Sequence, residues 1–558
     1  MLPMALLLAV FAPAAELKLA QDLSSSTSIS SATTGSGSAE VVFRDLLVQY
    51  TAGSGDRVQK RVTELGGQTR RRYRHINALL CALPEDSIKT LASDSAVSYI
   101  SPDRGVKATL DYAAAAAGAA SARGAGWDGR GIGIAVIDSG VDAVTDLAKR
   151  IVYSETFVAD NVTKDPYGHG THVAGIVAGS GASSTGGSYT RTFIGIVPRA
   201  QIVNLRALDA HGRGTDGQVI AAIDRAIELK GRYNIRVINL SLGRPIVESY
   251  MQDPLCQAVE RAWQAGIVVV VAAGNAGRDN SLGTSGYGTI LSPGNDPFVL
   301  TVGAMNTVGS ATRGDDVMTS YSSKGPTAID HIVKPDIVAP GNRLIALRAT
   351  DGYLARQYPE NGVPYSLISA TGRRGVSPDY YILSGTSMAT PVVTGAAAAL
   401  LHKNPSLTPD QVKARLMKTA WKALPPSSTA TDPVTGTTYH IQYDIFTVGA
   451  GYLDIAAALA DESVGAGTAK SPTAIADPAT GRVSVVFDTG VIWGSSVIWG
   501  SSVIWGSNVL ISGTSVIWGS SVIWGCAGTS AYSVIWGSSV IWGSDDGCLE
   551  GAAIRGDR

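Results

Sequence analysis

The sequence predicts an α/β protein whose parallel sheet is covered by helices on both faces. Short apolar runs alternate with longer segments whose apolar residues recur at helical spacing. Strands that are apolar on both faces and separated by helices are typical of a parallel sheet buried on both sides. The expected strands are 131–138, 201–208, 237–242, 267–273 and 299–303.

The intervening helices are indicated by apolar residues that return every three or four positions. One carries Val219, Ile220, Ile223, Ala226 and Ile227, and the next carries Leu255, Val259, Ala262 and Trp263 before it stops at Gly266. Thr408 as N-cap and Pro409 at the first position predict a helix over 411–420. The small apolar run 388–401 predicts a buried helix.

Composition excludes several classes of protein. The 558 residues are 45% hydrophobic and 16% charged, so the chain is globular and long enough for two or three domains. A net charge of -1 gives no general attraction to nucleic acid, and the densest basic patch, Arg70 to Arg72 with Arg74, is interpreted as a solvated face. Beyond the N-terminus, no apolar stretch is long enough for a membrane helix.

Four cysteines are too few for a disulfide scaffold. Cys81 and Cys256 stand among apolar residues and are expected in the core, whereas Cys526 and Cys548 could pair with each other.

The N-terminal part of the chain divides into three segments. Residues 1–20 are interpreted as an export signal because the apolar run ends in Ala12-Pro13-Ala14, although it lacks the usual basic flank. Residues 21–40 are a flexible linker rich in Ser, Thr and Gly. Residues 41–106 form a small α+β domain, with strands expected at 41–43, 46–48, 78–83 and 97–103 and helices at 57–65 and 85–92.

The C-terminal part is repetitive. After the main domain, 107–460, a spacer over 461–490 leads to the repeat 491–543 and an end segment 544–558. Val-Ile-Trp-Gly occurs seven times there, with a six-residue period. Such a repeat favours short stacked strands, and a repeat expanded outside the core without a role of its own is the alternative.

Four separate stretches carry the residues expected to do chemistry, and three of them follow strands or begin a helix in the first part of the main domain. Asp138 ends a buried strand, where it could orient a histidine, cap a turn or bind a metal. His169 lies between glycines at the head of a helix and is the candidate base, whereas His172 is interpreted as structural. Asn275 follows another buried strand, where it could donate to an oxyanion or simply form a turn.

Ser387 opens the small-residue helix. There the unpaired amides of the first turn could receive an oxyanion while the serine attacks a carbonyl, or Ser387 could be only an N-cap.

Together these stretches closely resemble the subtilisin-like serine peptidases, or subtilases. The matching motifs are Val136-Ile137-Asp138-Ser139-Gly140, Gly168-His169-Gly170-Thr171-His172-Val173-Ala174-Gly175, Ala273-Gly274-Asn275 and Gly385-Thr386-Ser387-Met388-Ala389-Thr390-Pro391. The resemblance covers about 41–459 and leaves out the tail. It implies a parallel seven-stranded sheet preceded by a small α+β propeptide domain that acts as an inhibitor.

The resemblance also implies roles for individual residues. Asp138 would hold His169, His169 would take the proton of Ser387, and Asn275 with the Ser387 amide would form the oxyanion hole. The substrate-binding residues would be Ser241, Leu242, Gly243, Ala273 and Gly274. Arg244, where many relatives have glycine, would narrow the substrate cleft or add a basic contact.

No cofactor is required by this reading. Calcium is possible but doubtful, because Asp146 matches one expected ligand whereas Arg191 stands where oxygen ligands would be expected.

The function expected from the resemblance is a secreted or cell-surface serine endopeptidase made as a self-processed zymogen. Its partners would be protein or peptide substrates and its own propeptide, cleaved between residues 104 and 117, with no nucleic acid and no membrane span. A sedolisin-type acid peptidase would have Glu at His169 and Asp at Asn275, and therefore fits poorly. The alternative from another class is a surface adhesion or assembly protein that acts through its Trp-rich repeat.

Overall fold

The computed structural model describes two compact units of the chain. The described residues are 18–20, 23, 42–73, 75–103, 105–108, 117, 119–281, 283–310, 313–477, 482–486, 509–512, 515–518 and 556–557. Unit 1 consists of residues up to 104 together with 247–257, and unit 2 consists of 105–246 and 258–558. Residues 491–508 and 519–543 of the predicted repeat, most of the end segment, and most of the predicted export segment and linker lie outside the described residues, as do Cys526 and Cys548.

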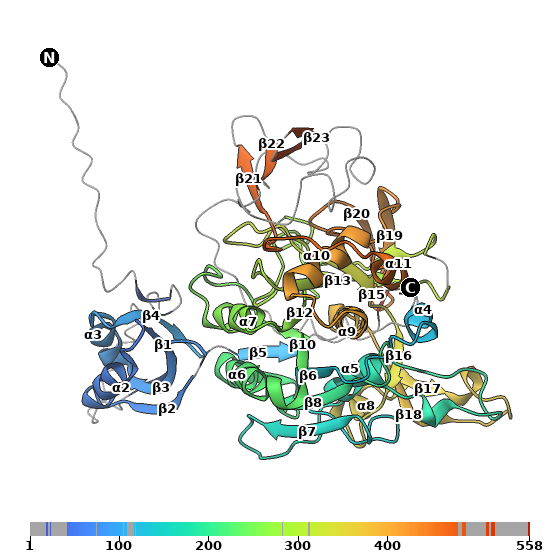
Figure 1. The fold of residues 1–558 in the computed structure, drawn as a ribbon, viewed down its shortest axis with the longest axis horizontal. Coiled ribbons are helices and arrows are strands. Elements are labelled where there is room, and N and C mark those ends of the chain that lie inside the picture. The colour runs from blue at the N-terminus through green and yellow to red at the C-terminus, as the bar shows by residue number, and fades with distance from the viewer. Residues whose placement is uncertain are drawn as a thin grey trace. The chain divides into compact units, whose positions relative to one another are not determined.

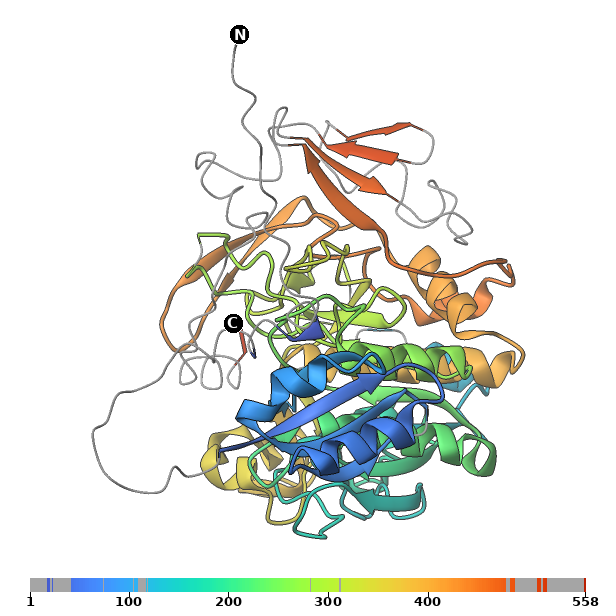
Figure 2. The same ribbon diagram turned by 90° about the vertical axis from the view of Figure 1, so that its left-hand side faces the viewer.

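Unit 1 is an antiparallel sheet with helices on one face (Figure 2). Its strands, in the order β2-β3-β1-β4, are β1 (Phe43–Tyr50), β2 (Gln68–Arg72), β3 (Ala78–Pro84) and β4 (Val97–Pro102). Its helices are α2 (Gly55–Glu64) and α3 (Ile88–Ala92), the latter preceded by the short turn η3 (Glu85–Ser87). Alternate apolar residues of the strands meet Val58 and Val62 of α2 and Leu91 of α3 in one core.

Two details of unit 1 differ from the sequence prediction. The two predicted runs 41–43 and 46–48 form the single strand β1. β2 was not predicted because its sequence, Gln-Thr-Arg-Arg-Arg, has no apolar residue to signal a strand. It is an edge strand whose arginines face solvent, and Arg70 pairs with Asp45 at 2.7 Å, so the basic patch is a solvated face as expected.

The large sheet of unit 2 contains seven parallel strands and one short antiparallel strand. The strands are β6 (Gly133–Asp138), β7 (Ile151–Thr156), β8 (Gln201–Arg206), β10 (Ile235–Leu240), β12 (Val268–Ala272), β13 (Leu300–Asn306), β14 (Val317–Met318) and β15 (Ile337–Pro340). Their order is β14-β13-β12-β10-β6-β8-β7, with β15 also paired to β13 and only β14 antiparallel. The predicted α/β class is therefore confirmed, and β14 is an addition that two residues could not signal.

Helices cover both faces of this sheet. α6 (Asp216–Tyr233) lies on one side of β6 and β10, and α5 (His169–Ala178) and α9 (Thr386–Lys403) lie on the other (Figure 1). The remaining helices are α4 (Ala119–Gly124), α7 (Pro254–Gln264), α8 (Tyr353–Gln357), α10 (Pro409–Thr419) and α11 (Ile455–Ala460). Thr408 is the N-cap of α10, as predicted from the sequence, and it also forms a reciprocal capping box with Gln411.

α9 is the central helix of unit 2. It contacts β10, β12, β13 and β15, and its residues from Thr386 to Leu401 are all buried. Thin side chains make this possible: a Cβ on Gly395 would overlap the side chain of Ile196. The alanine run thus forms the predicted buried helix because only small residues let neighbouring elements approach it closely.

Smaller sheets surround the large one. They are formed by β11 (Leu242–Gly243), β5 (Gly105–Ala108) and β9 (Arg213–Thr215); by β16 (Leu344–Leu347), β18 (Val376–Leu383) and β17 (Gly362–Pro364); and by β19 (Ser427–Thr431) and β20 (Thr438–Gln442). A further sheet contains β21 (Thr473–Asp477), β22 (Arg482–Val486), β24 (Ser515–Trp518) and β23 (Val509–Ser512).

The predicted spacer 461–490 therefore holds two strands, and β22 pairs antiparallel with a segment of the repeat. Within the described residues, no helix is both long and apolar enough to cross a membrane.

Cys81 and Cys256 are both buried, as expected of core residues.

Candidate active site

The structure joins two of the predicted site residues directly. Asp138 is the last residue of β6, and His169 is the first residue of α5. The Nδ1 atom of His169 lies 2.7 Å from Oδ1 of Asp138, and both side chains are fully buried. A carboxylate that accepts from Nδ1–H leaves the lone pair on Nε2, the form that a general base requires.

Glycines make this approach possible. Gly168, with φ at 102°, starts α5 in a left-handed conformation that a side chain would strain. Gly170 lies against the turn after β6, where a Cβ would overlap the carbonyl oxygen of Gly140 and lie 3.1 Å from Cβ of Asp138. The glycines around His169 therefore let α5 begin in direct contact with the end of β6.

Asp165 fixes the start of α5 and was not singled out by sequence reasoning. Its carboxylate accepts hydrogen bonds from the amides of Gly168 and Thr171, each at 2.7 Å, and from the Ser139 hydroxyl at 2.8 Å. Burial raises the pKa of Asp165 to about 6, and the hydrogen bonds oppose that rise. The sequence signal was an acidic residue shortly before a glycine-led helix, a pattern common to many caps.

Ser387 is the second residue of α9. The helix begins at Thr386 with Gly385 as N-cap, so the interpretation of Ser387 as a simple N-cap is wrong. α9 packs against α5, the helix that His169 begins. Ser387 therefore stands in the first turn of a buried helix, where backbone amides have no carbonyl partner within the helix.

Pro391 shapes the backbone at Ser387. A proline has no N–H, so the Ser387 carbonyl, four residues earlier, lacks its helical donor. The hydroxyl of Ser241 donates to that carbonyl at 2.8 Å, and the hydroxyl of Ser387 donates to the carbonyl of Ser241 at 3.3 Å. This pair of bonds ties the start of α9 to the segment between β10 and β11.

Asn275 is oriented by the residue before Ser387. Its Oδ1 accepts from the amide and the hydroxyl of Thr386, both at 3.1 Å. The hydroxyl of Thr386 in turn accepts from the amide of Gly274 at 3.2 Å. Because Oδ1 is occupied, the NH2 end of Asn275 points away from Thr386, and Nδ2 is buried without an acceptor among the described residues.

Three of the predicted site residues present buried polar atoms with no hydrogen-bond partner among the described residues. They are Oδ2 of Asp138 and Nε2 of His169, which are acceptors, and Nδ2 of Asn275, which is a donor. Leaving a buried polar group unpaired costs about 1–3 kcal/mol. A transient partner would satisfy the last two: a serine hydroxyl proton at His169 and a developing oxyanion at Asn275.

A strand of the chain itself lies between two edge strands near Ser387. β5 pairs antiparallel with β11, where Ala108 faces Leu242 and Lys107 faces Gly243. On its other side β5 pairs with β9, from Gly105 opposite Thr215 to Lys107 opposite Arg213. Leu242 and Gly243, predicted to bind an extended peptide, pair in this structure with Ala108 and Lys107 of the chain itself.

Arg244, expected to narrow the cleft or to add a basic contact with substrate, forms an ion pair in this structure. Its guanidinium is buried, and Nε donates to both oxygens of Asp216 at 2.9 and 3.1 Å. Arg244 directly follows β11 and Asp216 directly follows β9, so the ion pair links the two strands that flank β5. Sequence spacing could not show this pairing, because 28 residues separate the two side chains.

Ala273 and Gly274 occupy the turn before Asn275. The amide of Ala273 donates to Val302 and its carbonyl accepts from Leu291, both at 3.0 Å, so its backbone is already paired. Gly274 has φ at 109°, and a Cβ there would lie 2.7 Å from the side chain of Leu291. The turn therefore needs glycine to reach Thr386.

His172 lies one turn beyond His169 and packs in the core, as interpreted from the sequence. Its Nε2 lies 3.2 Å from the carbonyl oxygens of Leu344 and Tyr381. Burial, followed by the influence of His169, lowers the pKa of His172 to about 3. The ring is therefore neutral and donates through Nε2.

The surroundings of Asp146 do not fit a calcium ion. One carboxylate oxygen accepts from the Ser183 amide at 2.8 Å and the other from the Tyr380 hydroxyl at 3.2 Å. The described part of the chain holds no cluster of three or more acidic, His or Cys side chains suited to a metal. Calcium prefers six to eight oxygen ligands, usually including several carboxylates.

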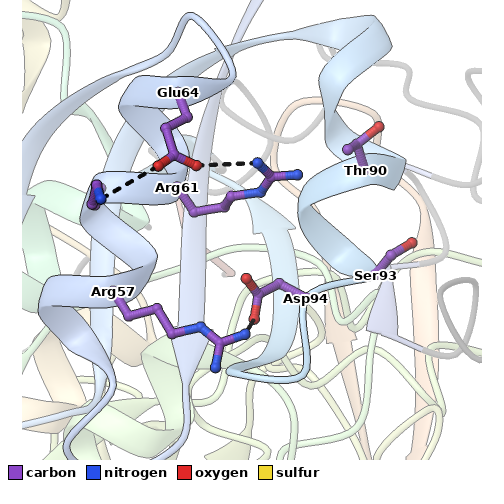
Figure 3. A pocket seen from close by; sticks show the side chains of 7 residues that line it. Arg57, Arg61, Glu64, Thr90, Ser93 and Asp94 are labelled. Atoms are coloured by element: carbon purple, nitrogen blue, oxygen red, sulfur yellow. Dashed lines mark hydrogen bonds and ion pairs between the residues drawn. The ribbon is translucent and has the colours of Figure 1, made fainter.

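A hollow in unit 1 contains none of these residues. It lies between α2 and the turn after α3, where Arg57 pairs with Asp94 at 2.7 Å and Arg61 pairs with Glu64 at 3.1 Å (Figure 3). These ion pairs are partly exposed, and in each pair the two charges neutralise each other. The hollow therefore offers no unpaired charge for a reaction.

Comparison with known proteins identifies the family of the chain. A model of the Subtilase family matches residues 129–462, well over half of the chain. Serine protease AprX of Bacillus subtilis (strain 168) is 36% identical over 375 residues, which cover 64% of this chain and 77% of the relative. Subtilisin E of the same organism is 32% identical over 367 residues, covering 64% of this chain and 79% of the relative.

Among solved structures, fervidolysin from Fervidobacterium pennivorans, described as a keratinolytic enzyme related to subtilisin, has a TM-score of 0.58. It is 22% identical and covers 82% of this chain and 68% of its own, so the likeness supports the fold. The family match, the relatives and the shared α/β fold agree, and the chain belongs to the subtilase family of serine endopeptidases.

Proposed function

We propose that Asp138, His169 and Ser387 form the catalytic triad of this peptidase and that Asn275 forms its oxyanion hole. The unpaired Nε2 of His169, set by the 2.7 Å contact of Nδ1 with Asp138, is the observation that carries the assignment. The unpaired Nδ2 of Asn275 supports the oxyanion role independently.

In the proposed reaction His169 Nε2 takes the hydroxyl proton of Ser387 as Oγ attacks the scissile carbonyl. Asp138 stabilises the imidazolium ion that forms, and Asn275 Nδ2 with the Ser387 amide donates to the oxyanion. His169 then gives the proton to the leaving amine, and the acyl group stays on Ser387. Water, deprotonated by His169, releases the acid and restores the hydroxyl.

The peptide substrate is proposed to bind as an extended strand between β9 and β11. β5 supports this, because residues 105–108 already take that position with antiparallel pairing on both sides. Main-chain pairing of this kind binds peptides with little regard to sequence. The expected substrates are therefore unfolded or extended segments of proteins.

The same strand supports production as a self-processed zymogen. β5 directly follows unit 1, so the peptide bonds after residue 108 run on from a strand that already occupies the substrate position. Cleavage between residues 104 and 117 would separate the N-terminal part of unit 1, the proposed inhibitory propeptide, from the peptidase, which would keep residues 247–257. Export to the cell surface or medium is proposed from the apolar N-terminus and from the family.

An adhesion or assembly protein acting through the repeat is the less favoured alternative. The family match and the arranged site argue for catalysis, whereas β23 and β24 show only that part of the repeat pairs with β22. Deleting 491–543 would distinguish the two, since the peptidase proposal predicts unchanged proteolysis.

The deciding test compares wild type with Ser387→Ala by mass spectrometry after fluorophosphonate treatment, with casein hydrolysis as the activity assay. We expect the wild type to lose the residues before the cut, to carry the label on Ser387 and to digest casein, and the variant to remain full-length, unlabelled and inactive. A folded wild type that stays full-length and unlabelled would overturn the proposal.

A further inference from the structure

Gly556 and Asp557 lie inside unit 2, far in sequence from their neighbours. Asp557 is only 1% exposed. Its carboxylate accepts from the Ser320 amide at 2.6 Å, the Ser320 hydroxyl at 2.7 Å and Nη2 of Arg278 at 2.8 Å. Its backbone exchanges two hydrogen bonds with the side chain of Asn342, at 3.0 and 3.1 Å.

The arginine of this site is held in place by other contacts. Nε of Arg278 donates to the Ser320 hydroxyl at 2.7 Å, and Nη1 lies 3.2 Å from Asp432. The guanidinium also lies over the rings of Tyr321 and Tyr439, at 5.8 and 5.6 Å from their centres. A buried arginine in a fixed position is a strong ligand for a carboxylate, because charge-assisted hydrogen bonds gain from the dry surroundings.

The site also selects the residue before the aspartate. Gly556 has φ at 67°, and a Cβ there would lie 2.5 Å from Oδ1 of Asn342 and 2.7 Å from the Ser384 hydroxyl. A residue with a side chain would clash with both. The site is therefore complementary to an aspartate preceded by glycine, and an acidic residue preceded by any other residue would not fit.

The three residues that hold Asp557 belong to the loops that support the proposed active site. Arg278 is three positions after Asn275, and the carbonyl of Tyr321, next to Ser320, accepts from the Gly277 amide at 2.8 Å. The Tyr321 hydroxyl donates to the carbonyl of Gly341, beside Asn342, at 2.9 Å.

That Gly341 carbonyl also accepts from the amide of Gly385, the N-cap of α9, at 2.7 Å. Asp557 therefore links the loop after Asn275 to the loop that holds the start of α9.

We propose that Gly556-Asp557 is an internal ligand of the peptidase unit, bound in a carboxylate site built by Arg278, Ser320 and Asn342, and that its binding positions the loops bearing Asn275 and Ser387. The binding part of this proposal does not depend on the protein being a peptidase, whereas the positioning part rests on the proposed function. Asp557 is then a positioning residue, because it acts through neighbouring loops.

Binding is tested by hydrogen exchange in full-length Ser387→Ala, which removes self-digestion. Asp557→Asn should raise exchange in peptides covering 276–280 and 317–323 about tenfold or more, since an amide beside Arg278 loses the charge-assisted bonds. Glu462→Gln, which also removes one negative charge but from a side chain that is 84% exposed, is the control. Equal exchange in the two variants would overturn the internal-ligand proposal.

Positioning is tested with the otherwise wild-type enzyme, whose mass is measured first. Asp557→Asn should lower kcat for a chromogenic peptide about tenfold with little change in KM, whereas Glu462→Gln should change neither. Loss of residues 556–558 from the active form, or an unchanged kcat beside increased exchange, would overturn the positioning role. An inactive wild type would contradict the proposed function and leave the exchange result to decide the binding.

Discussion

The imidazole of His169 and the carboxylate of Asp138 are in contact at 2.7 Å with neither side chain exposed to solvent. In such a dry pair the carboxylate determines which ring nitrogen carries the proton. Replacing Asp138 by asparagine, which removes the charge and keeps the shape of the side chain, therefore tests the role of this contact.

Asp138→Asn should lower kcat about 10⁴-fold while the protein stays folded. The amide can donate to Nδ1, and a ring that accepts there carries its proton on Nε2, where it cannot act as a base. Turnover of a chromogenic peptide and circular dichroism are the measurements. A fall of less than tenfold in a folded variant would mean that Asp138 does not orient His169.

Asn275→Ala should lower kcat about 10²–10³-fold, a magnitude carried over from subtilisin itself, with a small change in KM. The loop should keep its shape because its backbone contacts remain. Thr386→Val should also lower kcat, since the hydroxyl that orients Asn275 is lost, and Thr386→Ser is the matched control that retains it. Equal activity of the two Thr386 variants would show that the hydroxyl is not needed to position Asn275.

Asp216→Asn should destabilise the protein by about 3–5 kcal/mol, because it removes the carboxylate to which Nε of the buried Arg244 donates. Pairing it with Arg244→Met should recover much of that loss. Urea unfolding in the Ser387→Ala background measures both.

Glu462→Gln, in a pair with Lys403 at 3.6 Å that is mostly exposed, should cost less than about 1 kcal/mol. If Asp216→Asn lowers the free energy of unfolding no more than Glu462→Gln does, the ion pair between Arg244 and Asp216 does not stabilise the link between β9 and β11.

His172 should make stability depend on pH between about 3 and 6.5. The folded ring has its pKa lowered to about 3, so across this range the unfolded state binds a proton that the folded state does not. Stability from this group is complete above pH 6.5 and decreases as pH falls toward 3, by about 1.4 kcal/mol per unit.

Urea unfolding at pH 7.5 and 5 in the Ser387→Ala background measures this effect. His172→Asn should lose about 2 kcal/mol less than its parent over that interval. His440→Asn, at an exposed position of β20, should behave like the parent. Parallel pH dependence of His172→Asn and its parent would rule out the buried neutral ring.

Sequence reasoning succeeded where local pattern determines structure. The valine and isoleucine runs of the large sheet, the capping box at Thr408 and the alanine-rich α9 each follow from neighbours along the chain. It failed where the structure of a residue depends on a partner that is distant in the sequence. The polar strand β2 exists because it pairs with β3, and Arg244 is buried because Asp216 neutralises it.

The candidate site shows the same division. Asp138, His169, Asn275 and Ser387 were predicted from strand ends, helix starts and the family resemblance. Asp165 and the hydrogen bond from Ser241 to the Ser387 carbonyl were not, because hydrogen bonds that compensate for a missing donor or fix a helix start leave no periodic signal.

The placement of β5 between β9 and β11 has a consequence for when the enzyme can work. A tethered segment competes with free peptides at an effective concentration in the millimolar range, whatever the protein concentration. An intact chain would therefore stay inactive at ordinary substrate concentrations. After cleavage the segment would no longer be tethered, and it would dissociate when the protein is dilute. The onset of proteolysis would then follow the departure of a fragment rather than the completion of folding.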